Sequence, residues 1–346
     1  METGPMQMKD LDRQMAVAII NHNTCDQLHA CLQSIFLETV AVHKKGMVIV
    51  VDNASTDGSV AMLRDEFPWV TVQANEDNPG YGTAANQAIR LVSASWMAKY
   101  VLLLNSDTRL MPFTLQALVD YLEGNPRVAI AGPLLLGLDG KLQNSCFSYP
   151  DLLNTLLTQT SLGKVAGLVP LIKERFQPDC SDQQARAVPW LLGAALAIRR
   201  EAFAAIGGFD ESFFMYSEEV DLCYRLAQAG WQIHFVPQAA MIHVGGASTR
   251  RYRKEMEVLR YASTRLFYRK HYSRWSMLLL RLFVTYTMFR NTARDSARLG
   301  GWWSEEQPDG NCRERIKEDI DLWSKVLTDT WRVPARETQR MVERRP

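Results

Sequence analysis

Short apolar segments alternate with amphipathic segments through the first 135 residues, and this alternation restricts the fold more than any other feature of the sequence. Apolar runs occupy residues 16–20, 47–53, 69–75 and 100–107, and segments with helical spacing occupy 25–37, 58–67, 83–93 and 112–123. Strands that alternate with helices predict a parallel sheet built from βαβ units. The continuous apolar character of the strands predicts that helices cover both faces of this sheet.

Asn and Asp side chains end all four predicted strands. They are Asn21-His22-Asn23, Asp52-Asn53, Asn75 and Asn105-Ser106-Asp107. The carboxyl ends of parallel strands share one edge of a sheet, and ligands of open α/β sheets bind there. A polar residue that merely begins a loop explains any one cluster, but four such clusters in succession favour a shared ligand site.

Composition and charge exclude several other classes of protein. The chain has 346 residues, 47% of them apolar, and a net charge of +1, so it is neither a disordered chain nor one drawn to nucleic acid by its overall charge. Its six cysteines include no CxxC pair, so a zinc ribbon is not expected and a reducing compartment is the default. The first 14 residues are polar, and the longest apolar stretch, 275–289, is interrupted by Arg281 and too short to span a membrane. We therefore expect a cytoplasmic location.

A basic segment with helical character follows residue 250. Between Arg250 and Asp295 there are 12 Lys and Arg against 3 Asp and Glu, interleaved with leucines and aromatic residues. Such a segment can lie on the inner face of the cell membrane as a basic amphipathic surface. It can equally pack one face on the preceding domain and expose its Lys and Arg on the other. Peripheral membrane contact through residues 250–295 is thus one of two expectations, and RNA binding is a weaker third because no nucleic-acid fold accompanies the patch.

Four segments in this order and spacing resemble glycosyltransferase family 2. They are VAIINHN (17–23), VVDNASTDGS (50–59), NPGYGTAANQA (78–88) with LLLNSDT (102–108), and GGFDESFFMYSEEVDLCYRLAQAGW (207–231) followed by HVGGAST (243–249). Within that family of inverting GT-A enzymes, they resemble the rhamnosyltransferase-like branch. The resemblance runs from about residue 15 to 272 and implies an α/β GT-A fold, with a mostly parallel central sheet, flanking helices and a helical C-terminal appendage.

The resemblance also implies a domain organisation. We expect a tail over residues 1–14, a catalytic domain over 15–250 and a basic helical region over 251–346. Within the catalytic domain, the nucleotide-sugar half covers about 15–135 and the acceptor half about 136–250. The Leu-rich segment 152–176 reads either as a mobile flap or as a variable surface insertion.

The expected donor site lies along the predicted sheet edge. Asp52 is the expected nucleobase reader, because a carboxylate can accept the N3–H of uracil or thymine and purines offer no equivalent edge. Asp57 is expected to cap a helix instead. The Gly-rich loop around Gly80 opens a helix, which suits a nearby phosphate or sugar hydroxyl. The expected donor-binding residues are Asn21, Asn23, Asp52, Asn75, Gly80, Asn86, Asn105, Ser106 and Asp107.

Asn105-Ser106-Asp107 stands where the family has its DxD motif. A divalent cation held by carboxylate oxygen neutralises the diphosphate leaving group in such reactions. Because Asn105 replaces the first Asp, Asp107 is the expected carboxylate ligand. The resemblance implies that His243 completes the site, with packing as the alternative for this residue, and Mn²⁺ accepts imidazole readily. We expect Mg²⁺ or Mn²⁺ as cofactor.

Glu218 and Glu219 directly precede an apolar helical segment. The start of a helix favours carboxylates electrostatically, so a purely structural role would explain the two residues. The resemblance implies a general base here, which takes the proton of the acceptor hydroxyl. Glu219 is the expected base and Glu218 its partner, since two adjacent carboxylates raise one pKa. The expected acceptor-binding residues are Trp190, Gly193, Asp210 and Tyr216.

The resemblance therefore implies an inverting, metal-assisted transfer of a hexose to an acceptor hydroxyl. dTDP-L-rhamnose is the favoured donor, with a UDP-sugar next, and the acceptor is a glycan, a lipid-linked sugar or a small molecule. A nucleotidyltransferase would need a Gly-rich phosphate loop after the first strand, where this chain has Asn21-His22-Asn23. A nucleotide-sugar-binding or membrane-surface carbohydrate-binding protein with weak or lost catalysis is the remaining alternative, because Asn105 departs from the DxD pattern.

Overall fold

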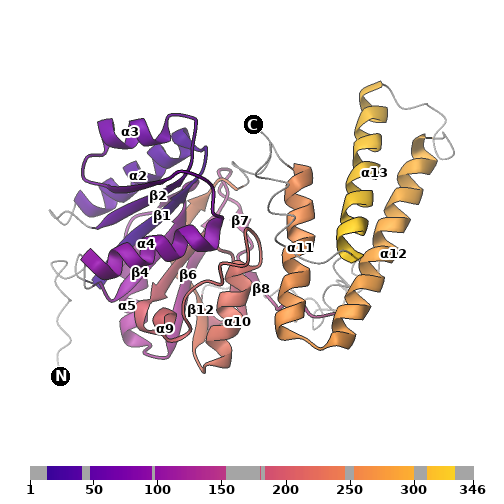
Figure 1. Ribbon diagram of the computed structural model, residues 1–346. Helices are drawn as coiled ribbons and strands as arrows, with labels where there is room; N and C mark the ends of the chain where they lie inside the picture. Colours follow the sequence, from indigo (N-terminus) through magenta and orange to yellow (C-terminus); the bar gives the residue numbers. More distant parts are fainter. Residues whose placement is uncertain are drawn as a thin grey trace. The chain divides into compact units, whose positions relative to one another are not determined.

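The computed structural model describes residues 14–40, 47–95, 98–152, 180, 184–245, 253–299 and 310–331. Contacts between these residues divide the chain into two units, one built on a β-sheet and one that contains the three C-terminal helices (Figure 1). The expected tail over residues 1–14 and the segment 152–176 fall almost wholly outside the described residues.

The alternating elements predicted from the sequence are all present in the first unit. They are β1 (Met15–Asn21), α2 (Cys25–Val40), β2 (Val48–Asn53), α3 (Ser59–Glu66), β3 (Thr71–Asn75), α4 (Tyr81–Ser95), β4 (Tyr100–Asn105) and α5 (Thr114–Gly124), with the short β5 (Thr108–Leu110) between β4 and α5. The remainder of this unit consists of β6 (Val128–Leu136), β7 (Leu142–Gln143), β8 (Cys146–Phe147), β9 (Arg186–Ala187), β10 (Trp190–Leu191), β11 (Ala195–Arg199), α9 (Arg200–Ala205), α10 (Glu218–Gln228) and β12 (Gln232–His243).

The main sheet has the strand order β3-β2-β1-β4-β11-β6-β12-β5. Strands β3, β2, β1 and β4 run parallel, while β11 lies antiparallel between β4 and β6. The predicted α/β architecture with a mostly parallel central sheet is thereby confirmed. Pro237 by itself suggests a break between two short strands over 231–243, but β12 is one strand whose register against β6 shifts between Val236 and Ala240. A proline fits at such an irregularity because it has no N–H to donate to the ladder.

Alternate residues of β1 enter the cores on the two faces of the sheet. Val17 and Ile19 share a core with α2 and α5, whereas Ala18 and Ile20 share one with α4, α9 and α10. With both faces covered, the register of the strands is fixed and the polar strand ends fall in one row. Asn21 lies opposite Asp52, Ile20 opposite Asn105, and Asn53 opposite Asn75.

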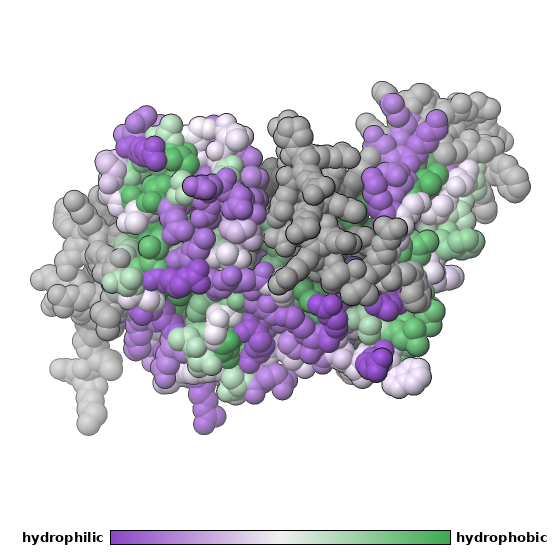
Figure 2. All heavy atoms as spheres, in the orientation of Figure 1, coloured by the Kyte–Doolittle hydropathy of each residue, from purple (hydrophilic) through white to green (hydrophobic). Residues whose placement is uncertain are grey.

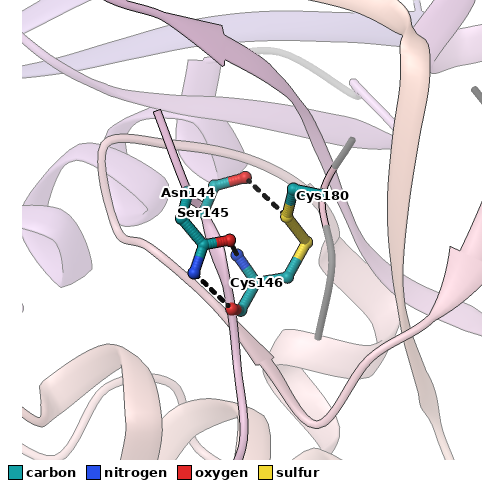
Figure 3. The surroundings of a disulfide bond; sticks show 4 residues. All are labelled: Asn144, Ser145, Cys146 and Cys180. Carbon is teal, nitrogen blue, oxygen red and sulfur yellow. Dashed lines mark hydrogen bonds between the residues drawn. A yellow bond between two sulfur atoms is a disulfide. The ribbon is translucent and has the colours of Figure 1, made fainter. Parts of the chain in front are cut away.

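Cys146 of β8 forms a disulfide with Cys180, 34 residues further along the chain (Figure 3). The Oγ atom of Ser145 lies 3.7 Å from the Cys180 sulfur. The low cysteine density predicted a reducing compartment, where disulfides seldom persist, so this bond is at odds with that prediction. Because β8 pairs with β10, the bond attaches Cys180 to a two-stranded sheet beside the main one.

The second unit contains α11 (Arg253–His271), α12 (Arg274–Leu299) and α13 (Gly310–Trp331). The three helices confirm the helical character expected of residues 251–346 wherever the structure describes them. Helix α12 packs along α13 (Figure 1), and the indole N–H of Trp323 donates to Asp295 at 3.1 Å. Within the described parts of the chain, no helix combines the length and the apolar character needed to cross a bilayer.

Candidate active site

Asp52 and Asn21 lie opposite each other at the carboxyl-end edge of the sheet, where the sugar-donor site is expected. The Asn21 amide donates to Asp52 Oδ2 at 2.7 Å, and the backbone N–H of Ser55 donates to Oδ1 at 2.8 Å. Both side chains are only 1% exposed. Each carboxylate oxygen has two lone pairs, so each Asp52 oxygen keeps one further acceptor position. Asp52 thus clamps β1 to β2 and retains the capacity to accept another hydrogen bond.

Two buried hydroxyl groups connect this edge to the end of β4. Thr24 Oγ1 donates to Asn21 Oδ1 at 2.7 Å and lies 2.6 Å from the hydroxyl of Ser106. Ser106 directly precedes Asp107, so the position of Asp107 is coupled through hydrogen bonds to that of Asp52. Sequence reasoning did not select Thr24, whose hydroxyl partner is 82 residues away.

Three other predicted donor residues hold loops in place. Asn23 Oδ1 accepts the N–H of Thr56 at 2.8 Å, while the Asn75 amide donates to Asn53 and Gln87 at 2.9 Å each. The Asn86 amide donates to the carbonyl of Phe209 and to Glu211, and its oxygen accepts the Phe209 N–H. Asn86 therefore fixes the 209–211 loop. Asp57 accepts the N–H groups of Cys25 and Ser59, the first residues of α2 and α3, although the N-cap position of α3 itself is Gly58.

Gly80 allows the loop before α4 to approach Phe214 very closely. Its φ is +91°, and a Cβ added there would lie 2.4 Å from the carbonyl oxygen of Phe214. That carbonyl accepts the N–H of Tyr81 at 3.0 Å. Only glycine fits both the backbone conformation and the contact, so the loop requires Gly80 at this position to hold Tyr81 in place.

Asp107 and His243 come together although they are far apart in the sequence. Asp107 Oδ1 lies 3.4 Å from His243 Nε2, and the two residues are 8% and 7% exposed. Pairing of β12 with β5 places His243 opposite Thr108, and the Val244 N–H donates to the Asp107 carbonyl at 3.0 Å. Two ligands about 2.1 Å from one cation, at roughly 90–110°, are about 3.0–3.4 Å apart. The observed separation therefore suits a shared divalent cation.

Gln143 fixes the orientation of His243. Its Oε1 lies 2.7 Å from His243 Nδ1. When Oε1 accepts the Nδ1 proton, Nε2 keeps its lone pair on the side of Asp107, which is the tautomer that a metal ligand needs. Among the described residues, no group of three or more His, Cys, Asp or Glu is arranged to hold a metal. Any remaining ligands would come from Asn105, water or the substrate.

Glu218 and Glu219 form a carboxylate pair in the first turn of α10. Burial raises the pKa of Glu219 to about 7. Burial, with the charge of Glu219 as a second cause, raises the pKa of Glu218 well above its usual range. The Oε2 atom of each side chain is buried and has no hydrogen-bond partner among the described residues. Glu219 is the more exposed of the two, so it is the better placed to meet an incoming hydroxyl.

Tyr81 links the carboxylate pair to the Asp107 side of the site. Its hydroxyl donates to the Gly193 carbonyl at 3.0 Å. Burial raises its pKa well above the usual range, and the negative charges of Glu218, Glu219 and Asp107 add to this effect. Sequence reasoning missed Tyr81, although it is part of the NPGYG loop.

Gly193 lies directly beside Glu219. A Cβ added to Gly193 would be 3.6 Å from the Cβ and Cγ atoms of Glu219. The next residue, Ala194, accepts the N–H of Asn105 at 2.9 Å. Hydrogen bonds, contacts and peptide links between neighbouring residues therefore connect Asp52, Asp107, His243 and Glu219 in one network.

The other predicted acceptor residues have structural partners of their own. Trp190 stacks on Phe147 with ring centroids 4.6 Å apart, and its indole N–H donates to the Ser148 carbonyl. Asp210 closes a local turn by accepting the N–H and the hydroxyl of Ser212. Tyr216 falls in the second unit, and its role as an acceptor contact stays a prediction.

Comparison with known proteins identifies the family of this chain. A family model described as glycosyltransferase like family 2 matches residues 13–277. An N-acetylglucosaminyl-diphospho-decaprenol L-rhamnosyltransferase from Mycobacterium tuberculosis (strain H37Rv) is 31% identical over 302 residues, which covers 82% of this chain and 95% of the relative. The rhamnosyltransferase WbbL of Escherichia coli (strain K12) is 30% identical over 169 residues, 47% of this chain and 60% of the relative.

Two solved structures share the fold. One is GalNAc-T7 with UDP, GalNAc and Mn²⁺, with a TM-score of 0.54 and 15% identity over 89% of this chain and 54% of that one. The other is a mannosyltransferase from Pyrobaculum calidifontis with GDP-Man and Mn²⁺, with a TM-score of 0.54 and 16% identity over 92% of this chain and 87% of that one. The GT-A fold expected from the sequence is thereby confirmed.

Proposed function

The chain belongs to glycosyltransferase family 2, and from this premise we propose that it transfers L-rhamnose from dTDP-L-rhamnose to a lipid-linked sugar acceptor. The proposal is supported by two relatives whose names specify rhamnosyl transfer, one of which matches 82% of this chain. The observation that carries it is the convergence of Asp107, His243 and Glu219 around Tyr81 and Gly193. A UDP-sugar is the second candidate donor.

On this proposal, the sheet edge around Asp52 binds the nucleotide. The free acceptor position on each Asp52 oxygen can receive the N3–H of thymine or uracil, while Asn21 and Ser55 hold the carboxylate in place. Asn75 ends β3 at the same edge, and the Gly80 carbonyl accepts the amide of Asn53, the residue opposite Asn75. Adenine presents no ring N–H at the corresponding position, so we expect dTDP and UDP to bind better than ADP.

The residues at the end of β4 fit a divalent cation. Asp107 and His243 would hold Mg²⁺ or Mn²⁺, and imidazole ligation favours Mn²⁺. When bound, the cation neutralises the charge that builds up on the diphosphate leaving group. Gln143 keeps the imidazole in the required tautomer, and Ser106 is held by Thr24, so the chain orients this side of the site before substrate arrives.

Glu219 is the proposed general base. The acceptor oxygen attacks the anomeric carbon from the face opposite the diphosphate, and the bond from that carbon to the phosphate oxygen breaks with its electron pair. The acceptor proton passes to Glu219, whose raised pKa of about 7 lies near the working pH, as efficient base catalysis requires. This single displacement inverts the anomeric configuration. Tyr81 holds Gly193 beside the carboxylate and so positions the base.

We place the enzyme at the cytoplasmic face of the membrane, because a diphospho-polyprenol acceptor is anchored in the bilayer. The Cys146–Cys180 disulfide is the one feature that argues for a more oxidising location.

The proposal is tested with the purified full chain, Mn²⁺ or Mg²⁺, a panel of dTDP-, UDP- and GDP-sugars and a short-chain N-acetylglucosaminyl-diphospho-prenol. Release of dTDP that depends on the acceptor is the expected result. Glu219→Gln and Asp107→Asn should lower its rate at least about 100-fold, while the exposed controls Glu201→Gln and Asp120→Asn should retain it. A folded protein that binds dTDP but turns over no donor would instead indicate a nucleotide-sugar-binding protein with weak or lost catalysis.

A further inference from the structure

Helix α12 is apolar on two opposite sides. One side is buried in the helical unit and includes Leu280, Val284 and Met288. The other side, here called the outer face, is solvent-exposed, and Figure 2 shows hydrophobic residues at the surface over this helix. The outer face consists of Trp275 (75% exposed), Leu278 (38%), Leu279 (52%), Leu282 (51%), Tyr286 (59%) and Phe289 (72%).

The outer face is a continuous stripe and not a set of scattered residues. Trp275, Leu279, Leu282, Tyr286 and Phe289 follow one another at alternating steps of four and three, which keeps them on one side of an α-helix. At about 1.5 Å per residue the stripe is about 21 Å long. Single exposed apolar side chains are ordinary in a globular protein, but a contiguous apolar surface of this kind marks an interaction site.

Positive charge borders the stripe on both sides. At about 100° per residue, Arg274 and Arg281 lie roughly 100–120° to one side of Trp275, and Arg290 and Arg294 lie roughly 60–100° to the other. No Asp or Glu occurs between Arg274 and Arg294. Arg294 itself is paired with the next residue, Asp295, at 3.1 Å, so Arg274, Arg281 and Arg290 carry most of the flanking charge. The helix thus presents an apolar centre, with Trp and Tyr among its members, between two rows of arginine.

We propose that the outer face of α12 binds flat on an anionic lipid bilayer. Its apolar side chains would enter the boundary between headgroups and acyl chains, while the flanking arginines reach the lipid phosphates. Trp and Tyr prefer this interfacial depth because each combines an apolar ring with a polar group. A helix with an apolar stripe on one side and arginines beside it lies in the plane of the interface.

The charge pattern argues against a second copy of this chain as the occupant. A symmetric dimer through the outer face would bring the same surface of both subunits together. Arginine rows would then face arginine rows, and this stretch of the helix offers no acidic residue to pair with them. An anionic surface complements both the apolar and the charged parts of the face.

Vesicle co-sedimentation of the full chain tests the proposal without any sugar substrate, so the result does not depend on the proposed reaction. Vesicles of phosphatidylcholine alone are compared with vesicles that contain about one third phosphatidylglycerol. The wild type should bind the anionic vesicles, and the triple variant L279S/L282S/F289S should show a partition coefficient at least about tenfold lower. The matched control Leu37→Ser, which changes a leucine 73% exposed on α2, should bind like the wild type.

A double variant, R274Q/R290Q, separates the electrostatic part of the binding from the apolar part. It should bind anionic vesicles more weakly than the wild type and discriminate less between the two lipid mixtures. The thermal unfolding of all variants should match that of the wild type, because the substituted side chains lie at the surface.

Three results would overturn the proposal. One is a folded wild type that ignores anionic vesicles, and another is a triple variant that binds them as well as the wild type. The third is self-association of the wild type in sedimentation velocity that the triple variant loses, without vesicle binding, which would identify a second copy as the occupant. A wild type that binds anionic vesicles but shows no transferase activity would contradict the proposed reaction and leave the membrane proposal standing.

Discussion

Gln143 Oε1 lies 2.7 Å from Nδ1 of His243, the residue whose Nε2 is 3.4 Å from Asp107. The hydrogen bond spans 100 residues of sequence and fixes which imidazole nitrogen is free to bind a cation.

Replacing Gln143 should weaken metal binding without removing a ligand. Gln143→Leu leaves Nδ1 without its acceptor, so the imidazole can rotate or take the other tautomer. We expect Mn²⁺ affinity, measured by electron paramagnetic resonance of free Mn²⁺, to fall about 10- to 100-fold. Gln143→Glu restores an acceptor and should recover most of the affinity, whereas Gln228→Leu, an exposed change on α10, should have no effect. Equal affinities in all four proteins would show that Gln143 does not orient a metal ligand.

The rate of transfer should depend on pH through Glu219. The base must be ionised to accept a proton, and its pKa is raised to about 7, so kcat should rise with pH and level off above about pH 8. Glu219→Gln should lower kcat by about 10²- to 10⁴-fold and remove this pH dependence. An unchanged profile in the variant would assign the base to another residue. Glu201→Gln is the control.

The same substitution should change the pH dependence of folding. In the unfolded chain Glu219 ionises near its ordinary pKa of 4.5, whereas in the folded chain it ionises near 7. Stability associated with the protonated carboxyl is complete below 4.5 and is lost as pH rises through about 7. Glu219→Gln cannot ionise, so relative to the wild type it should gain about 1–3 kcal/mol between about pH 4 and pH 8. Urea unfolding without metal measures this, and a pH-independent difference would contradict it.

Gly80→Ala should be more destabilising than Gly58→Ala. Both glycines have positive φ, +91° and +89°, so both substitutions should cost about 1–2 kcal/mol of backbone strain. At Gly58 the new methyl group meets nothing within 4 Å, but at Gly80 it would lie 2.4 Å from the Phe214 carbonyl. We expect Gly80→Ala to lose about 1–3 kcal/mol more in urea unfolding. Equal losses would mean that the loop moves away from Phe214 at no cost.

Reduction of the Cys146–Cys180 bond should destabilise the first unit. A closed loop of 34 residues corresponds to about 3–4 kcal/mol in the chain-entropy model, and measured values are often smaller. The midpoint of urea unfolding should therefore fall when dithiothreitol is added to the wild type, and Cys146→Ser should not respond. Alkylation of the unfolded, unreduced wild type should modify two fewer cysteines than alkylation after reduction. If all six cysteines react without reductant, the bond is absent in solution.

The part of the fold that sequence reasoning predicted well is the part where neighbouring residues determine the structure. Strands β1, β2 and β4 are buried on both faces and therefore read as apolar runs, and each ends where an Asn or Asp begins a turn. The extent of β12 was harder to predict from the sequence. Pro237 suggests a break in the strand, but the ladder accommodates this proline at a register shift.

The details of the site depend on contacts between distant residues, which a sequence pattern does not encode. Tyr81 bonds Gly193 across 112 residues, and Gln143 belongs to no motif. Asn86 was expected near the donor because it follows the Gly-rich loop, but its amide is used to hold Phe209 and Glu211. The sequence does not show which side of α12 is exposed, for a similar reason. The helix is apolar on two sides, and only the packing shows which one is covered.

The hydrogen bond between Asn105 and Ala194 has a consequence for how this enzyme can evolve. It belongs to the antiparallel pairing of β4 with β11, which places the leaving-group side next to the glycine that borders the base. On the proposed mechanism, this pairing sets the spacing between the departing diphosphate and the attacking oxygen. Every acceptor must present its reactive hydroxyl at one depth, so new acceptor preferences should arise from changes around that hydroxyl while the spacing itself stays constant.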